Sequence, residues 1–198
     1  AITPKTKMLI FNSPSNPTGA VYTEEEIRAL AAVVEKAGIW VLSDEIYSKL
    51  IYDGVKHFSM AQVSDKLKER TIIINGVSKT YAMTGWRIGW LAAPKDVAKA
   101  IDSFQSHATS NPASVSQYAT LAALNGSEEE LEKMRDIFND RRKFMIERIR
   151  KIDGLDCIEP DGAFYIMLVV DKLYGKRFNC RKIGGSLDVA DMLLEKGV

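Results

Sequence analysis

Residues 71–80 read TIIINGVSKT, an apolar run that passes through a turn into a lysine. The run 71–75 has the length and the β-branched composition of a buried strand, so Lys79 stands where that strand ends. Burial disfavours an ammonium ion and leaves a free amine for Schiff-base chemistry. Arg87 follows shortly afterwards and offers a planar fork of donors that suits a phosphate. An amine that can bind an aldehyde, beside an arginine that can hold a phosphate, predicts pyridoxal phosphate as the cofactor.

Short apolar runs alternate with helical patterns on both sides of this segment. The predicted strands are residues 7–11, 39–43, 71–75 and 89–93, and the predicted helices are residues 24–37, 95–105, 113–125 and 127–152. Short apolar strands separated by helices are typical of an α/β fold, in which flanking helices cover a mostly parallel sheet.

The pattern changes after the long helix. Residues 155–158 and 163–169 are predicted strands, and residues 186–196 are a predicted helix. These form a separate α+β layer, and we expect the boundary inside the long helix. Residues 1–140 are therefore predicted to be part of a large cofactor-binding domain, and residues 141–198 part of a smaller C-terminal domain.

Composition and charge argue against several classes of function, namely nucleic-acid binding, membrane binding and metal binding. Hydrophobic residues make up 46% of the 198 residues and charged ones 27%, as in a soluble globular protein. A net charge of +1 does not favour a nucleic acid or an acidic membrane surface as partner. Cys157 and Cys180 have no metal-ligand spacing and are interpreted as reduced thiols, and the first residues lack the apolar core of a signal peptide. We expect a cytoplasmic protein with no metal site.

Polar residues cluster at the predicted strand ends. Asn16 follows the first strand, Asp44 follows the second and Lys79 follows the third. Ligands of open α/β sheets bind at the carboxyl ends of the strands. Arg87 precedes the fourth strand, so a loop has to bring it to that edge.

A pyridoxal phosphate site needs an amine, a carboxylate at the ring nitrogen, donors to the ring oxygen and a phosphate clamp. Lys79 supplies the amine and Arg87 the clamp. Asp44 suits the ring nitrogen, because a carboxylate keeps that nitrogen protonated and able to accept electrons. Tyr47 and Asn16 suit the ring oxygen. His57 and His107 have no partner at catalytic spacing and are interpreted as non-catalytic.

Four motifs carry a family resemblance. They are NPTG at 16–19, SDEIY at 43–47, SK at 78–79 and GWRIG at 85–89. Their order and spacing resemble the class I aminotransferases of fold-type I, which depend on pyridoxal phosphate. The bacterial aspartate aminotransferase branch is the most similar, because its lysine segment commonly ends in the MTGWR run found at 83–87. The resemblance covers nearly the whole chain.

The resemblance implies a ping-pong transfer of an amino group from an L-amino acid, aspartate, to 2-oxoglutarate through a Schiff base on Lys79. Lys79 would also move the proton between the substrate and the cofactor. Asp44 would pair with the ring nitrogen, Tyr47 and Asn16 with the ring oxygen, and Arg87 with the phosphate. Asn16 would also contact the substrate carboxylate, and the bond before Pro17 would be cis. The family further implies a homodimer.

Two positions depart from the family pattern. Many relatives carry a serine phosphate donor where this chain has Gly76. Animal-type aspartate aminotransferases have an arginine for the distal carboxylate in a stretch that reads FQSHAT here, at 104–109. A preference for dicarboxylates would have to come from elsewhere in the protein.

Alternatives remain open. The same scaffold supports other reactions, such as those of an aromatic aminotransferase or a C–S β-lyase. The chain has no initiator Met and corresponds to roughly half of a family member, so we expect a piece of a longer protein. Three family features are not in these 198 residues. They are the glycine-rich phosphate loop, the aromatic ring that stacks on the cofactor, and the substrate-binding arginine, which is expected beyond Val198. A non-catalytic structural fragment is therefore the third hypothesis.

We predict that residues 1–198 alone show little or no transaminase activity, because contacts to cofactor and substrate are missing. Turnover of aspartate with 2-oxoglutarate, followed by product formation, measures this. Turnover at an ordinary enzyme's rate would contradict the prediction.

Overall fold

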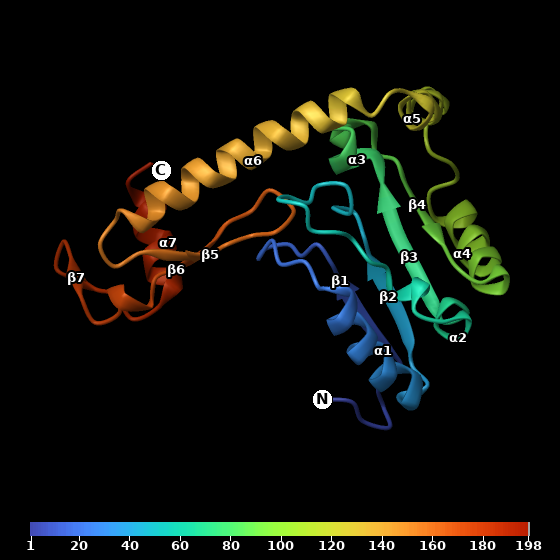
Figure 1. The fold of residues 1–198 in the computed structure, drawn as a ribbon, viewed down its shortest axis with the longest axis horizontal. Coiled ribbons are helices and arrows are strands. Elements are labelled where there is room, and N and C mark those ends of the chain that lie inside the picture. The colour runs from blue at the N-terminus through green and yellow to red at the C-terminus, as the bar shows by residue number, and fades with distance from the viewer. Residues whose placement is uncertain (198) are drawn as a thin grey trace.

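The main feature of the molecule is a four-stranded sheet in the order β1-β2-β3-β4 (Figure 1). The computed structural model describes residues 1–197. Val198, the last residue of the expected C-terminal domain part, lies outside the described residues. The strands are β1 (Met8–Asn12), β2 (Trp40–Asp44), β3 (Thr71–Gly76) and β4 (Gly89–Ala92). Only β4 runs antiparallel to its neighbour. The expected α/β class with a mostly parallel sheet is confirmed.

The parallel strands end level with one another. Asn12 pairs with Asp44, and Asp44 pairs with Ile74. The polar residues that follow these strands therefore emerge at one edge of the sheet, where ligands bind in open α/β sheets.

The antiparallel strand β4 begins at that same edge, because Gly76 at the end of β3 pairs with Gly89 at the start of β4. Arg87 lies just before β4 and so reaches the edge directly. The sequence predicts that a loop brings Arg87 to this edge. In the structure that loop is the short connection through the 3-10 turn Thr84–Trp86.

Helix α1 (Glu24–Ala37) covers one face of the sheet. It begins at a capping box, in which Thr23 accepts from the backbone of Glu26 and the Glu26 carboxylate accepts from the backbone of Thr23, and it ends at Gly38 in the left-handed conformation. Its apolar stripe joins the first core cluster, which consists of Phe11, Ile27, Ala31, Val34, Ile39, Val41, Met60 and Leu67.

The remaining elements are mostly helical. They are α2 (Asp65–Lys68), α3 (Val77–Thr80), α4 (Lys95–Ala108), α5 (Ser114–Asn125), α6 (Glu129–Arg150), β5 (Asp156–Ile158), β6 (Met167–Val169), β7 (Arg177–Phe178), β8 (Arg181–Lys182) and α7 (Ser186–Glu195). The short helices α2 and α3 and the β7–β8 hairpin were not predicted from the sequence. All of them are too short to show a periodic apolar pattern.

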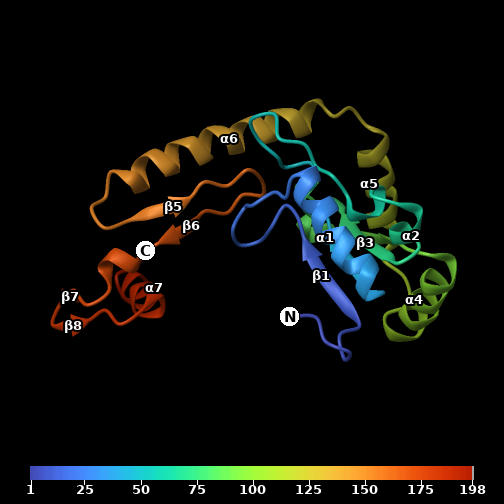
Figure 2. The same ribbon diagram turned by 60° about the horizontal axis from the view of Figure 1, so that its bottom comes forward.

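Helix α6 runs from the sheet to the smaller C-terminal elements (Figure 2). Near its start, Leu131 packs in a second cluster with Tyr47, Leu50 and Ala163. Near its end, Ile146 and Ile149 pack in a third cluster with Cys157. We propose that the domain boundary lies between these clusters, near Asp140. Although α6 has 22 residues, neither it nor any other helix within residues 1–197 is apolar and long enough to cross a membrane.

The connection between β5 and β6 returns to the sheet. The backbone N–H groups of Asp161 and Gly162 donate to the carbonyl of Gly19 at 3.0 and 2.9 Å, and that of Ala163 donates to Leu50 at 2.9 Å. Figures 1 and 2 both show this orange loop beside the blue and cyan loops. The predicted strand 163–169 is therefore too long: β6 begins at Met167, and Ala163, where the predicted strand starts, is bonded to Leu50 instead.

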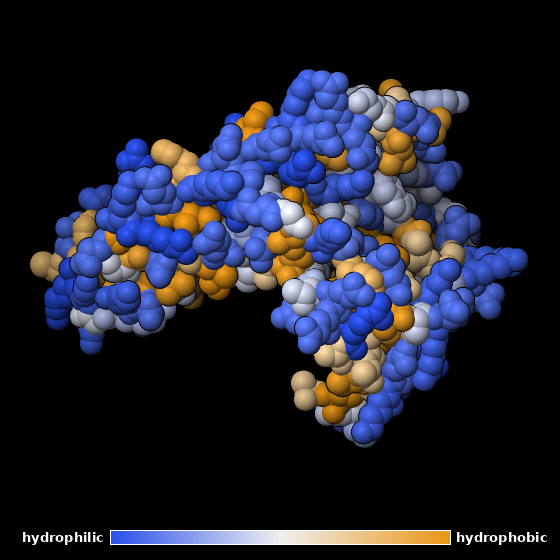
Figure 3. Space-filling view, in the orientation of Figure 1, coloured by the Kyte–Doolittle hydropathy of each residue, from blue (hydrophilic) through white to orange (hydrophobic). Residues whose placement is uncertain are grey.

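Apolar side chains also remain on the surface (Figure 3). Ile10, Phe104, Tyr118 and Leu187 are between 73% and 79% exposed, and they lie on β1, α4, α5 and α7. Soluble monomers rarely expose large contiguous apolar patches. These faces therefore suit burial against further protein.

Substitution of Gly19 tests the returning loop. A Cβ there would collide with the Cβ of Pro160 and lie 2.8 Å from the carbonyl oxygen of Gly162, at a φ of +72°. We expect Gly19→Ala to lower the free energy of unfolding by about 3 kcal/mol or more, measured by urea unfolding. Gly54 has a similar φ of +79° and open space around it, so Gly54→Ala should cost only about 1 kcal/mol. Equal losses in the two variants would refute the role of the contact.

Candidate active site

Lys79 lies half-buried in α3, one turn beyond the end of β3. At Gly76 the chain passes so close to β4 that a Cβ would lie 2.9 Å from the carbonyl oxygen of Ile88 and 3.0 Å from the Cα of Gly89. A serine side chain does not fit there unless β4 moves. The departure from the family pattern at Gly76 thus has a packing reason.

The Lys79 amine faces aromatic rings. Its Nζ lies 6.0 Å from the ring centroid of Tyr47 and 5.6 Å from that of Phe164. The hydroxyl of Tyr47 is 2.8 Å from the hydroxyl of Tyr165. Phe164 and Tyr165, which sequence reasoning missed, therefore join Tyr47 in an aromatic wall beside the lysine. The only signal for them was an aromatic pair one residue after the turn residues 159–162.

Tyr47 is buried, with 2% of its surface exposed. Burial raises its pKa above the ordinary value, and the hydrogen bond with Tyr165 and the charge of Asp44 raise the pKa further. The Tyr47 hydroxyl therefore stays protonated at neutral pH and can act as a hydrogen-bond donor.

Asn12 joins two of the predicted site segments. Its Nδ2 donates to the carbonyl of Asp44 at 3.1 Å, and its Oδ1 accepts from the backbone N–H of Asn16 at 2.8 Å. The turn that carries Asn16 is thereby held against the end of β2. The bond between Asn16 and Pro17 is cis, as the resemblance implied.

Arg87 is exposed and has a left-handed backbone with φ of 56°. Its Nη1 donates to the carbonyl of Thr84 at 3.0 Å, and within residues 1–197 it makes no ion pair. It lines a hollow of about 480 Å³ whose other walls come from β3, β4 and α4. Asn16, Asp44, Tyr47 and Lys79 thus gather at the edge of the sheet, whereas Arg87 stands at the same edge beside α4.

A buried acid follows Asp44 directly. Glu45 accepts hydrogen bonds from Ser43 at 2.9 Å and from Ser59, and it pairs with the Nε2 of His57 at 3.0 Å. Burial raises the pKa of Glu45, but the hydrogen bonds from His57 and Ser59 outweigh burial and bring that pKa below its ordinary value of 4.5. The cluster anchors the chain where it leaves β2. His57 therefore has a partner, Glu45, that its position in the sequence did not indicate.

The donor set fits one kind of cofactor. An amine, a carboxylate, a phenol and an amide lie around one sheet edge, and beside them stands a guanidinium that has no charged partner among residues 1–197. These groups match an aldehyde, a basic ring nitrogen, a ring oxygen and a phosphate, which pyridoxal phosphate combines. Among residues 1–197, His, Cys, Asp and Glu side chains form no group of three that could hold a metal ion.

Comparison with known proteins finds similarity to aminotransferases in both sequence and structure. The family model described as "Aminotransferase class I and II" matches residues 1–198. The aspartate aminotransferase of Geobacillus stearothermophilus is 52% identical over 84% of this chain and 42% of its own length. The crystal structure of the Rhizobium meliloti aspartate aminotransferase has a TM-score of 0.93 and 41% identity, over 98% of this chain and 49% of that one. The aromatic aminotransferase of Pyrococcus horikoshii has a TM-score of 0.79 and 42% identity, over 83% of this chain and 44% of that one. The chain thus spans less than half the length of each of these relatives.

The Glu45 cluster predicts an acid-sensitive contribution to stability. Because the folded protein depresses the pKa of Glu45, the contribution is fully present above the ordinary value of 4.5 and is lost as the pH falls through the folded value. We expect Glu45→Gln to lower the free energy of unfolding by about 2 kcal/mol at neutral pH, with a difference that shrinks in acid. Urea unfolding across the acid range measures this.

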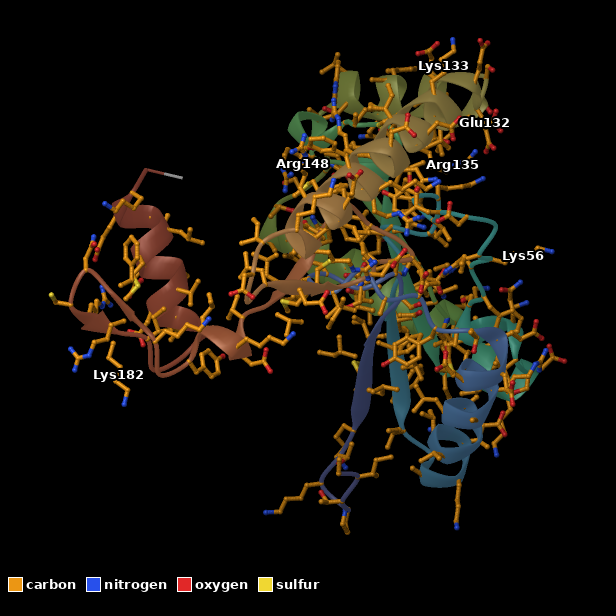
Figure 4. All side chains as sticks on the ribbon, turned by 60° about the vertical axis from the view of Figure 1, so that its left-hand side comes forward. Lys56, Glu132, Lys133, Arg135, Arg148 and Lys182 are labelled. Atoms are coloured by element: carbon orange, nitrogen blue, oxygen red, sulfur yellow. The ribbon has the colours of Figure 1, made fainter. Side chains whose placement is uncertain are left out.

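The control for that experiment is Glu132→Gln, since Glu132 is exposed and points away from α6 (Figure 4). It should differ little from the unsubstituted protein. A Glu45→Gln effect that is the same at every pH would refute the charge-based explanation.

Proposed function

The chain belongs to the class I and II aminotransferase family, and from this premise we propose that the protein carrying it transfers the amino group of aspartate to 2-oxoglutarate with pyridoxal phosphate. The observation that carries the proposal is the position of the Lys79 amine, 6.0 Å from the Tyr47 ring at the sheet edge where Asn12 joins Asp44 to the Asn16 turn. The names of the Geobacillus and Rhizobium relatives support aspartate as the amino donor.

Bound pyridoxal phosphate supplies an aldehyde that reacts with amines and a ring that accepts electrons. In this proposal Lys79 offers its amine to the aldehyde and moves a proton at the substrate carbon. Asp44 holds a proton on the ring nitrogen. Tyr47 donates to the ring oxygen, as its raised pKa allows, and Asn16 donates there as well. Arg87 binds the phosphate, because its guanidinium is exposed and has no charged partner within residues 1–197.

We propose a homodimer as the working form. The exposed apolar side chains of α4 and α5 support this, since Phe104 and Tyr118 are 74% and 75% exposed. Cys157 and Cys180 are free thiols, which supports a reducing compartment such as the cytoplasm.

An aromatic substrate is the second candidate. It is supported by the similarity to the Pyrococcus horikoshii aromatic aminotransferase and by the absence of an arginine from residues 104–109. Product analysis with aspartate, tyrosine and cystathionine separates an aspartate enzyme, an aromatic aminotransferase and a C–S β-lyase.

Covalent labelling tests the role of Lys79. The full-length protein is treated with pyridoxal phosphate and then borohydride, which reduces the imine to a stable bond that peptide mass analysis locates. We expect the label on Lys79, and Lys79→Ala should lose both the label and the visible absorbance of the bound cofactor. The control is Lys56→Ala, since Lys56 is exposed and points into solvent (Figure 4). Visible absorbance that persists in Lys79→Ala would refute the role of Lys79 as the residue that binds the cofactor.

A further inference from the structure

We infer that Arg142 is a positioning residue for this site. It holds the returning loop 160–163 in place, and that loop in turn holds Phe164 beside Lys79. The inference rests on the proposed function of Lys79, and it assigns a task to a residue that lies on α6, away from the strand-end groups.

The guanidinium of Arg142 is engaged on every side. Arg142 is 6% exposed. Its Nη1 donates to the carbonyl of Pro160 at 2.7 Å, its Nε donates to the side-chain oxygen of Asn139 at 3.0 Å, and its Nη2 pairs with Asp53. The Cζ of Arg142 lies over the ring of Tyr52, 5.1 Å from its centroid. One side chain thus ties α6 to the loop after β2 and to the returning loop.

Stability alone does not explain a buried arginine at this position. The side chain of its charged partner Asp53 is 49% exposed, and an ion pair with an exposed partner contributes little to stability. What an apolar side chain cannot supply is direction: the planar fork of Arg142 aims separate donors at Asp53 and Pro160. The arrangement therefore specifies where Pro160 lies relative to α6.

Tyr52 holds the other end of the same loop. Its hydroxyl donates to the carbonyl of Ala163, and its backbone N–H donates to the carbonyl of Asp161 at 2.9 Å. Burial raises the pKa of Tyr52 to about 12, so the hydroxyl keeps its proton at neutral pH. Arg142 lies over the Tyr52 ring and donates a hydrogen bond to Pro160, so the two side chains clamp the loop at both ends.

The clamp ends immediately before the aromatic wall. Phe164 follows Ala163, and its ring lies 5.3 Å from that of Tyr47 and 5.5 Å from that of Phe138. Lys79 Nζ lies 5.6 Å from the same ring. A shift of the clamped loop would move Phe164 away from the Lys79 amine.

A double-mutant cycle in the full-length protein tests the inference. The readout is the rate at which pyridoxal phosphate and borohydride label Lys79, for Arg142→Lys, Phe164→Leu and the combined variant. An aromatic ring stabilises a nearby ammonium, so displacing it should speed labelling by roughly twofold to fivefold. Because Arg142 acts through Phe164, the combined variant should label no faster than Phe164→Leu alone. The matched control is Arg148→Lys on the exposed face of α6 (Figure 4), which should leave the rate unchanged.

The outcomes separate the two proposals. Absence of label from Lys79 in the unsubstituted protein would overturn the proposed function, and the inference with it. Normal labelling that Arg142→Lys leaves unchanged, or effects of Arg142→Lys and Phe164→Leu that simply add, would overturn the inference alone. Circular dichroism checks that each variant is folded. If Arg142→Lys does not fold, Tyr52→Phe, which removes one hydroxyl from the clamp, takes its place in the same cycle.

Discussion

The parallel pairing of β1, β2 and β3 is the constraint on which the rest of the structure depends. Its register sets Asn12 beside Asp44 and Asp44 beside Ile74, so three chain segments leave the sheet at one edge. Parallel strands need long connections, and these connections carry the helices that cover the sheet. A one-residue slip would turn Asp44 to the opposite face, so the buried face of the sheet also protects the geometry of the site.

The loop between β5 and β6 supplies the second half of the site from far along the chain. It is bonded to Gly19 and Leu50 and clamped by Arg142, and it ends in Phe164 and Tyr165. The position of the C-terminal elements along α6 is thereby coupled to the surroundings of Lys79.

Much of the candidate site could be proposed from the sequence because its residues lie next to strand ends. Asn16, Asp44 and Lys79 each stand after a short apolar run, and such runs report buried strands locally. For Arg87, the sequence predicts a loop that brings it to the edge where the parallel strands end. In the structure β4 runs antiparallel and begins at that edge, and the direction of a strand cannot be inferred from its composition. The contacts made by Phe164 and Arg142, and the pairing of His57 with Glu45, were not predicted from the sequence. These contacts join chain segments that no spacing rule connects.

By itself the sequence determined the α/β class and the order of the main elements, and it nominated the candidate reactive groups, because local apolar periodicity and motif spacing encode these. Only the tertiary structure decided which groups meet. It turned β4 antiparallel, excluded a side chain at Gly76, buried Glu45 with His57 and brought the returning loop to Lys79. The physical reason is that these choices depend on packing and hydrogen bonds between residues far apart in the chain, and on the free space left when the elements are in place.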